Sequence, residues 1–294
     1  MGQKTKAFLQ LCRPANLPTS AADILAGLAL AGFFDHFTIE LDPLGGLLVL
    51  SSIFLYAGGV VLNDVFDIEL DKVERPERPL PKGVIKIGEA RIFGFGLLVI
   101  GLALAFSVTN MSGIIAAILV FFILTYDSYS KNRKVLGPLN MGICRGMNLL
   151  LGMSVFAELG HFKYAIIPII YIAAITMISQ GEVNGNNKKN IVFAGILYLI
   201  VVVIVLYFNT DFVSNLGVSH IFVLVFIVSI GIPLTKAYLK NTPSNIKKAV
   251  KAGVISIILL DSVIAVAHSN FAIGLVILTL LPVSIVLSKA FAVT

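Results

Sequence analysis

The sequence predicts an all-α integral membrane protein, a bundle of nine to ten transmembrane helices with its functional site at the cytoplasmic face. Hydrophobic residues make up 57% of the chain and charged residues 13%, whereas soluble domains carry roughly 25% charged residues. The mean hydropathy is +0.96, so lipid is the expected solvent for most side chains. Several apolar windows have the length of about 20 residues that crosses a bilayer as a helix. We expect one transmembrane domain over residues 1–294.

The first apolar window follows a short basic segment. It has no small-residue cleavage site and leads into further apolar windows, so we expect a retained membrane helix and not a removed signal. In chain order, the ten windows cover 16–34, 44–65, 91–109, 112–127, 138–157, 162–180, 190–208, 217–236, 247–267 and 270–288. The links at 109–112 and 268–270 are short enough to require antiparallel hairpins.

Basic residues lie on one side of the predicted bundle. When the connections are assigned alternately to two sides, all 22 Lys and Arg residues except Lys163 and Arg145 fall on the same side. The positive-inside rule places that side in the cytoplasm, together with both termini and the functional loops. If the protein is bacterial, we expect it in the cytoplasmic membrane. Ten helices are favoured over nine because nine would place Lys289 outside. Topology and anionic lipid headgroups explain the net charge of +6, so no nucleic-acid partner is expected.

The second predicted span is followed by an acidic run, Asn63-Asp64-Val-Phe-Asp67-Ile-Glu-Leu-Asp71. On a continuing helix, steps of 100° place the three aspartates within an arc of roughly 60°. Clustered carboxylates at a membrane interface require raised pKa values or a cation. Oxygen ligands suit Mg²⁺, which one or two carboxylates and substrate phosphates commonly hold. We therefore predict Mg²⁺ as cofactor and a diphosphate as the bound group, with four protein ligands: Asn63, Asp64, Asp67 and Asp71.

Basic side chains follow the acidic run and are candidates for contacts to the diphosphate. Arg75, Arg78 and Lys82 could neutralise phosphate oxygens that face away from the metal. Lys131, after the fourth span, could do so from the same side of the membrane. The alternative is an ordinary solvated loop whose acidic and basic residues pair with one another. The regular acidic spacing beside a membrane helix favours the metal and diphosphate interpretation.

The sequence around these residues resembles that of the UbiA superfamily of intramembrane prenyltransferases. The run from Asn63 to Asp71 matches its Asn-Asp-x-x-Asp-x-x-x-Asp motif, and Arg75-Pro-Glu-Arg-Pro-Leu-Pro-Lys-Gly is similar to the usual continuation. Arg13-Pro14 and the stretch from Tyr129 to Lys134 are also similar to the family pattern. The resemblance implies a UbiA-like bundle that moves an isoprenoid chain from a prenyl diphosphate to an unidentified aromatic or lipid-like acceptor, with release of diphosphate. The catalytic residues would be Asp64, Asp67, Asp71, Arg75 and Lys131.

The second aspartate-rich segment of that family differs here. The family carries roughly Asp-x-x-x-Asp after the sixth helix, whereas this chain has Glu182 and Asn186 at that spacing. These two residues could hold a further metal ion more weakly. The alternative is a polar turn rich in Gly and Asn. This segment and the stretch from Gly137 to Asn148 resemble the EboC-like branch of the superfamily more than its quinone-forming enzymes.

Polar residues also lie inside the predicted spans. Arg145 and Asn148 are three residues apart in the fifth span and so share a helix face. An arginine at membrane depth needs a cavity or a partner. We expect either a second contact to the diphosphate or acceptor, or an ion pair of Arg145 with Asp127 or Asp261. These two aspartates are alternatively candidate bases that activate the acceptor. For Asp23, in the first span, we expect a structural hydrogen bond.

Two other functions are open on these data. An intramembrane terpene cyclase would ionise the same substrate without an external acceptor, and the altered second motif raises this alternative. A membrane transporter or lipid-binding protein would distribute polar residues along a path through the midplane, whereas here they collect at one face. The expected partners are a prenyl diphosphate, a lipophilic acceptor and membrane lipids.

Overall fold

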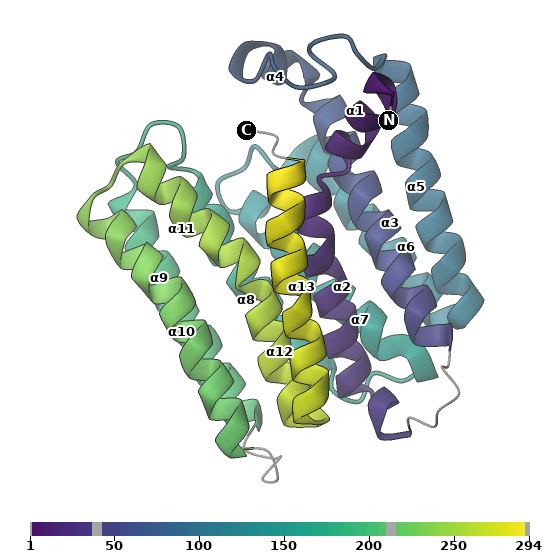
Figure 1. The fold of residues 1–294 in the computed structure, drawn as a ribbon, viewed down its shortest axis with the longest axis vertical. Helices are drawn as coiled ribbons and strands as arrows, with labels where there is room; N and C mark the ends of the chain where they lie inside the picture. The colour runs from purple at the N-terminus through teal and green to yellow at the C-terminus, as the bar shows by residue number, and fades with distance from the viewer. Residues whose placement is uncertain (1, 37–42, 210–215, 292–294) are drawn as a thin grey trace.

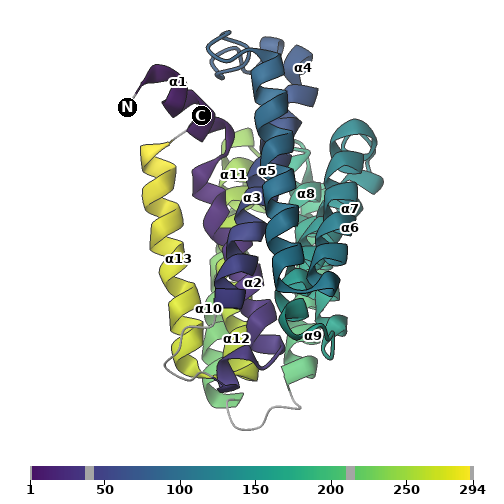
Figure 2. The same cartoon turned by 90° about the vertical axis from the view of Figure 1, so that its right-hand side faces the viewer.

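Helices form all the regular structure in the described part of the chain. The structure is a computed structural model and describes residues 2–36, 43–209 and 216–291. Most of the long helices run roughly along one direction (Figures 1 and 2). The α-helices are α1 (Gln3–Leu11), α2 (Leu17–Leu30), α3 (Pro43–Phe66), α4 (Ile68–Glu74), α5 (Ile87–Val108), α6 (Asn110–Thr125), α7 (Leu136–Met153), α8 (Ile166–Ser179), α9 (Lys188–Asn209), α10 (Leu216–Leu239), α11 (Pro243–Ile255), α12 (Ile257–His268) and α13 (Phe271–Ala290).

Each predicted window coincides with a helix or with a pair of consecutive helices. Among the described residues, eight candidate spans are long and apolar enough to cross a membrane. The 14-residue α2 and the 18-residue α7 lie among them and complete the bundle. The all-α membrane architecture is confirmed, while the number of crossings and the single domain stay predictions.

The helix boundaries differ from the expected windows by a few residues in several places, and two of the differences can be traced to specific contacts. The helix α5 begins at residue 87 and not at 91, because the Glu89 carboxylate accepts a hydrogen bond from the Lys86 backbone amide at 3.1 Å and so caps the first turn. The window 247–267 is divided between α11 and α12, with Ser256 at the break. The Ser256 hydroxyl lies 2.8 Å from that of Ser229 on α10.

The two short links form the expected hairpins. Thr109 caps α6 by accepting a hydrogen bond from the Ser112 amide at 2.9 Å. Asn270 caps α13 in the same way, with 3.1 Å between its Oδ1 and the Ile273 nitrogen. In each hairpin the two helices pack against each other, so the links reverse the chain direction without a long loop.

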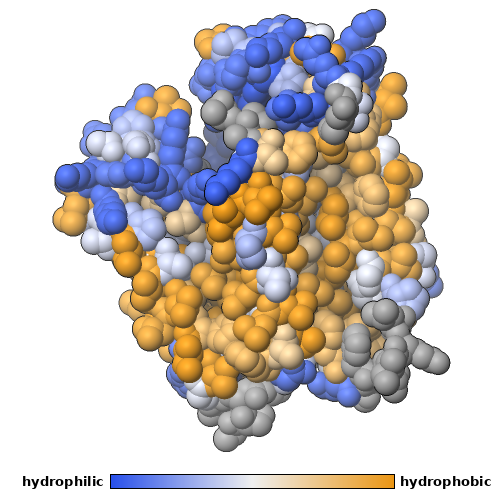
Figure 3. All heavy atoms as spheres, viewed as in Figure 1, coloured by the Kyte–Doolittle hydropathy of each residue, from blue (hydrophilic) through white to orange (hydrophobic). Residues whose placement is uncertain are grey.

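The surface has a broad apolar belt between two polar ends (Figure 3). Large apolar side chains on α5, α9, α10 and α13 are exposed in this belt, among them Val99, Leu199, Leu224 and Val286. Such a continuous apolar surface requires a lipid environment. The chain is therefore a multi-pass integral membrane protein, and the cytoplasmic placement of its ends stays a prediction.

The centre of the bundle brings α2, α7 and α12 close together. A Cβ atom on Gly27 of α2 would collide with the Leu149 carbonyl oxygen and the Gly152 Cα of α7. The two backbones can approach this closely only because both positions are glycine. Helix α12 packs on the same α2, so polar residues on these three helices can meet inside the membrane.

Candidate functional site

The acidic run lies where α3 passes into α4. Backbone hydrogen bonds continue across the junction, from the Asp67 nitrogen to Asn63 O at 3.0 Å and from the Asp71 nitrogen to Asp67 O at 2.8 Å. However, α3 ends at Phe66, and Asp67 occupies the N-cap of α4. The acidic run therefore spans two helices and not the single continuing helix that we expected.

Asp64 is the centre of a buried ion-pair network and is 5% exposed. Its Oδ1 accepts hydrogen bonds from Arg13 Nη2 at 2.5 Å and from Arg78 Nη1 at 3.1 Å. The same Arg78 nitrogen donates to Asp71 Oδ2 at 2.8 Å. The network joins four segments, namely the entrance to α2, the end of α3, the short helix α4 and the loop after α4.

Asp67 pairs with Lys131 from the other side of the bundle, with 2.5 Å between Oδ1 and Nζ. Lys131 follows a π-helical turn, Tyr126–Ser130, and its amide bonds to the Tyr126 carbonyl. Such turns are frequent at functional sites because the extra residue redirects the side chains around it. Next to this pair, Asn63 Nδ2 donates to Asp127 Oδ1 at 2.8 Å.

The three aspartates do not converge as the sequence predicted. In the described part of the chain, no three His, Cys, Asp or Glu side chains lie close enough to hold a metal ion. Arg78 bridges the carboxylates of Asp64 and Asp71, while Asp67 pairs with Lys131. The carboxylate and amide oxygens at this end of the molecule are nevertheless the kind of ligand that Mg²⁺ prefers. One of them, the buried Asp127 Oδ2, has no hydrogen-bond partner among the described residues. Metal binding by these residues stays a prediction.

The other predicted diphosphate contacts lie at the rim. Arg75 and Lys82 are exposed, and neither forms an ion pair with a described residue. The positive charge of Arg75 lies close enough to Glu182 to lower the pKa of its carboxyl. The second motif therefore lies at the same end of the molecule as the acidic run. Burial raises the pKa of Glu182, while Lys247 and Arg75 oppose that shift.

The segment around Glu182 is a polar turn, which was the alternative interpretation. Gly185 and Asn186 both adopt left-handed backbone angles, with φ of 67° and 53°. The Asn186 residue is exposed, and the Asn187 amide donates to the carbonyls of Met177 and Ile178 at the end of α8. Turn geometry therefore accounts for the asparagines, and metal binding by Glu182 and Asn186 is untested.

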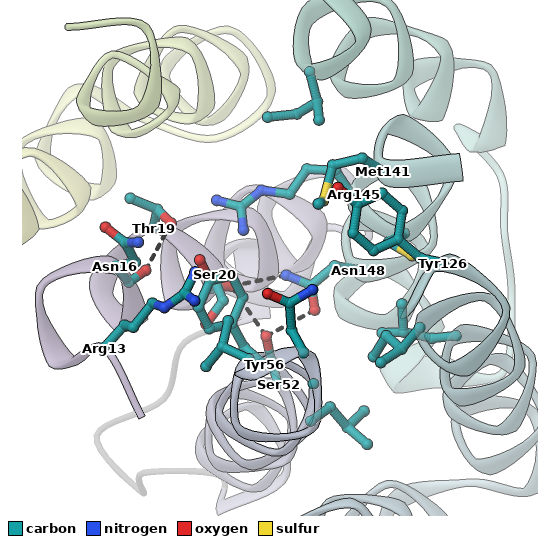
Figure 4. Close-up of a pocket in the computed structure, with 18 of the residues that line it drawn as sticks. Arg13, Asn16, Thr19, Ser20, Ser52, Tyr56, Tyr126, Met141, Arg145 and Asn148 are labelled. Atoms are coloured by element: carbon teal, nitrogen blue, oxygen red, sulfur yellow. Dashed lines mark hydrogen bonds between the residues drawn. The ribbon is translucent and has the colours of Figure 1, made fainter. Parts of the chain in front are cut away.

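A cavity of about 320 Å³ begins beside the ion-pair network. Arg13, Asn63 and Asp127 line its polar end, and the remaining wall is mostly apolar. The apolar side chains come from α3, α6, α8, α11 and α12, and include Leu55, Leu119, Ile123, Ile172, Ile175, Val254 and Ile257. Figure 4 shows Arg13 and Arg145 reaching into this cavity from different elements.

Arg145 and Asn148 of α7 lie at the inner end of the cavity. Arg145 Nε is 2.8 Å from Asp23 Oδ2, and Asn148 Nδ2 donates to the same oxygen at 2.8 Å. The prediction that Arg145 pairs with Asp127 or Asp261 was therefore wrong. Arg145 pairs with Asp23 instead, because α2 and α7 approach each other closely. The hydrogen bond expected for Asp23 is confirmed.

Arg13 was missing from the predicted site, and Asp127 was expected beside Arg145 or as a base that activates the acceptor, and not next to the acidic run. Arg13 adopts a left-handed backbone conformation, φ 47° and ψ 64°, which is uncommon for a residue other than glycine and often marks a functional position. Burial lowers the pKa of its guanidinium, but Asp64, Tyr56 and Asp71 together raise that pKa above its ordinary value, so Arg13 stays charged. The Arg-Pro pair before the first span was the available signal for Arg13. The π turn that places Asp127 left no signal in the sequence.

Comparison with known proteins identifies the family. Residues 20–182, more than half of the chain, match the UbiA prenyltransferase family. A digeranylgeranylglyceryl phosphate synthase from Sulfurisphaera tokodaii is 33% identical over 172 residues, which span 58% of this chain and 60% of that relative.

Solved structures of UbiA homologues share the fold. The apo structure of a homologue from Aeropyrum pernix has a TM-score of 0.68 at 16% identity and covers 85% of this chain and 97% of its own. A homologue from Archaeoglobus fulgidus bound to GPP and Mg²⁺ has a TM-score of 0.66 at 17% identity, with 93% and 99% covered. On the family match, the fold and the residues described above, this chain belongs to the UbiA prenyltransferase family.

Proposed function

We propose that this protein is a Mg²⁺-dependent intramembrane enzyme that transfers an isoprenoid chain from a prenyl diphosphate to a lipophilic acceptor. The observation that carries the proposal is the continuity of the ion-pair network with the cavity. Arg13 belongs to the network and also lines the cavity. A diphosphate bound by the network would therefore leave its apolar chain among the apolar side chains of the cavity wall.

The residues of the network would exchange partners when substrate binds. Asp64, Asp67 and Asp71, with the Asn63 amide oxygen, would hold Mg²⁺, and Glu182 and Asn186 are candidates for a second ion. When bound, Mg²⁺ neutralises negative charge that develops on the diphosphate as the allylic C–O bond breaks. Arg13, Arg78 and Lys131 would then turn from the carboxylates to the phosphate oxygens. The apolar cavity wall would exclude water from the allylic cation.

The relatives support this assignment. The curated relatives are digeranylgeranylglyceryl phosphate synthases by name, and the Archaeoglobus fulgidus homologue was solved with GPP and Mg²⁺. The acceptor of this chain is proposed only as a lipophilic molecule, because the match spans 60% of the first relative and because the second motif carries one acidic residue instead of two.

Diphosphate release by the purified protein tests the proposal. The assay contains Mg²⁺, prenyl diphosphates of several lengths and a lipid extract as the source of acceptor. We expect Asp64→Asn and Asp67→Asn to abolish release, while Glu69→Gln, a change at an exposed glutamate paired with Lys72, leaves it unchanged. Wild-type turnover by either aspartate variant would refute the site. Cyclic hydrocarbons formed without lipid extract would identify a terpene cyclase instead.

A further inference from the structure

The inner end of the cavity is polar, although it lies deep in the bundle. Ser52 is twelve residues before Asp64 on α3, which places it about 18 Å from the ion-pair network along the helix axis. At this depth Ser52 donates to the Asn148 Oδ1 at 2.7 Å, and Asn148 donates to the Ser20 carbonyl at 3.0 Å (Figure 4). Buried hydrogen bonds of this kind hold their members in one arrangement.

Three protein partners hold the Asn148 amide, and both of its N–H donors are used. Its oxygen accepts from Ser52, and its nitrogen donates to Ser20 O and Asp23 Oδ2. Asn148 therefore positions Asp23, and Asp23 in turn holds Arg145. We name the group formed by Ser20, Asp23, Ser52, Arg145 and Asn148 the inner recess.

Arg145 keeps a free donor in the inner recess. The residue is 7% exposed and lines the cavity. Its Nη2 has no hydrogen-bond partner among the described residues. A buried guanidinium N–H without an acceptor is costly, so a ligand oxygen that reached this nitrogen would gain from the contact.

The charge of the inner recess is balanced by protein groups. The Asp23 carboxylate neutralises Arg145 across the 2.8 Å ion pair. A second carboxyl group, that of Asp261 on α12, is 3% exposed and lies close enough to Asp23 for the two groups to interact electrostatically. Two buried carboxylates at such close range repel each other, which favours a proton on one of them. Two carboxyl groups with one proton between them and one guanidinium leave no net charge to attract an anion.

We propose that the inner recess binds a neutral oxygen atom of the lipophilic acceptor, a hydroxyl, carbonyl or ether oxygen, with Arg145 Nη2 as the hydrogen-bond donor. The reference to an acceptor rests on the prenyl transfer proposed above. The bound oxygen is not the attacking atom, because the diphosphate lies at the other end of the cavity. Arg145 is thus a binding residue that orients the acceptor, and Asp23 and Asn148 are positioning residues.

Two small probes of equal chain length test the charge preference. Geraniol carries a neutral hydroxyl group, and geranic acid carries a carboxylate on nearly the same skeleton. Binding of each is measured by equilibrium dialysis against the full chain in lipid nanodiscs, with empty nanodiscs to correct for partition into lipid. We expect geraniol to bind about tenfold more tightly or better, since desolvating a carboxylate in a neutral recess is unfavourable. Tighter binding of geranic acid, or no binding of geraniol above partition, would overturn the proposal.

A charge-balanced double variant tests the donor. Asp23→Asn with Arg145→Gln removes both charges together, so neither partner is left as an isolated buried ion. We expect it to weaken geraniol binding by about tenfold or more. Binding of dimethylallyl thiolodiphosphate with Mg²⁺ should stay within about twofold of wild type. Unchanged geraniol binding would refute the role of Arg145, and loss of thiolodiphosphate binding would make Arg145 a diphosphate contact instead.

Asp261→Asn provides a test that does not depend on folding of the double variant. If Asp261 carries the shared proton, the amide keeps the recess neutral, and the preference for geraniol stays within about twofold. Stronger binding of geranic acid would show that the wild-type recess holds two negative charges, which would refute its neutrality. Failure of wild type to bind the thiolodiphosphate would refute the proposed function alone, because the geraniol measurement does not depend on the diphosphate end.

Discussion

Arg13 and Asp64 are 51 residues apart in the sequence, yet the guanidinium Nη2 of one lies 2.5 Å from the carboxylate Oδ1 of the other. The contact fastens the entrance of α2 to the end of α3. It also holds Arg13 in a left-handed backbone conformation that has no steric advantage of its own. The pair therefore connects the ion-pair network to the mouth of the adjoining cavity.

Arg13→Gln should lower diphosphate release by about tenfold or more, because a hydrogen bond to a charged group contributes about 1.5–3 kcal/mol. The steady-state rate at saturating Mg²⁺ measures this effect. Lys4→Gln is the matched control, since Lys4 forms an exposed pair with Glu89. A rate equal to wild type for Arg13→Gln would remove Arg13 from the active site.

Lys131→Met should raise the KM for the prenyl diphosphate and reduce kcat, because Lys131 pairs with Asp67 across the bundle and would contact the phosphate oxygens. We expect a combined loss in kcat/KM of about tenfold or more. Arg133→Met serves as control. Arg133 is exposed and packs over the Tyr129 ring, 5.1 Å from its centroid, so its loss should leave kcat/KM nearly unchanged. Equal losses in both variants would indicate a general surface-charge effect.

Gly27→Ala should destabilise the protein by about 1–3 kcal/mol, because the added methyl group would separate α2 from α7. Gly96→Ala on α5 is the matched control, since a Cβ there meets no atom within 4 Å. Thermal unfolding in detergent compares the two variants with wild type. Equal melting temperatures for Gly27→Ala and Gly96→Ala would show that the close approach of α2 and α7 is unimportant for stability.

Glu182→Gln should change how stability depends on pH. Burial raises the pKa of this carboxyl above its ordinary value of 4.5. The fold therefore favours the protonated form, and this contribution to stability is complete below the unfolded pKa and is lost as pH rises through the folded one. The melting temperature of the variant relative to wild type should increase between about pH 4 and pH 7, measured in EDTA to exclude metal binding. Glu77→Gln, at an exposed site, should show no such trend.

The helices could be predicted from the sequence because lipid imposes one rule on every span. Each backbone polar group must be satisfied within the helix, so the apolar windows and the short links at 109–112 and 268–270 were sufficient evidence. The break at Ser256 could not be predicted. The apolar pattern continues through it, and the contact of Ser256 with Ser229 joins residues of two different helices.

The candidate site could be predicted in composition but only partly in geometry. The acidic run identified the residues that now form the ion-pair network. Which cation faces which carboxylate depends on distant segments, as Arg13, Arg78 and Lys131 show. The partner of Arg145 was missed for the same reason, because the approach of Asp23 follows from two glycines on different helices.

The ion pairs around Asp64 have a consequence for the order of assembly. Because Arg13 and Arg78 already compensate the aspartates, the helix ends can come together before any metal or substrate arrives. On the proposed function, substrate binding would be a competition in which phosphate groups replace carboxylates as partners of the same cations, and Mg²⁺ replaces the cations as partner of the carboxylates. The affinity for substrate would accordingly be a difference between two sets of strong contacts, which would allow tight recognition together with rapid release of the product.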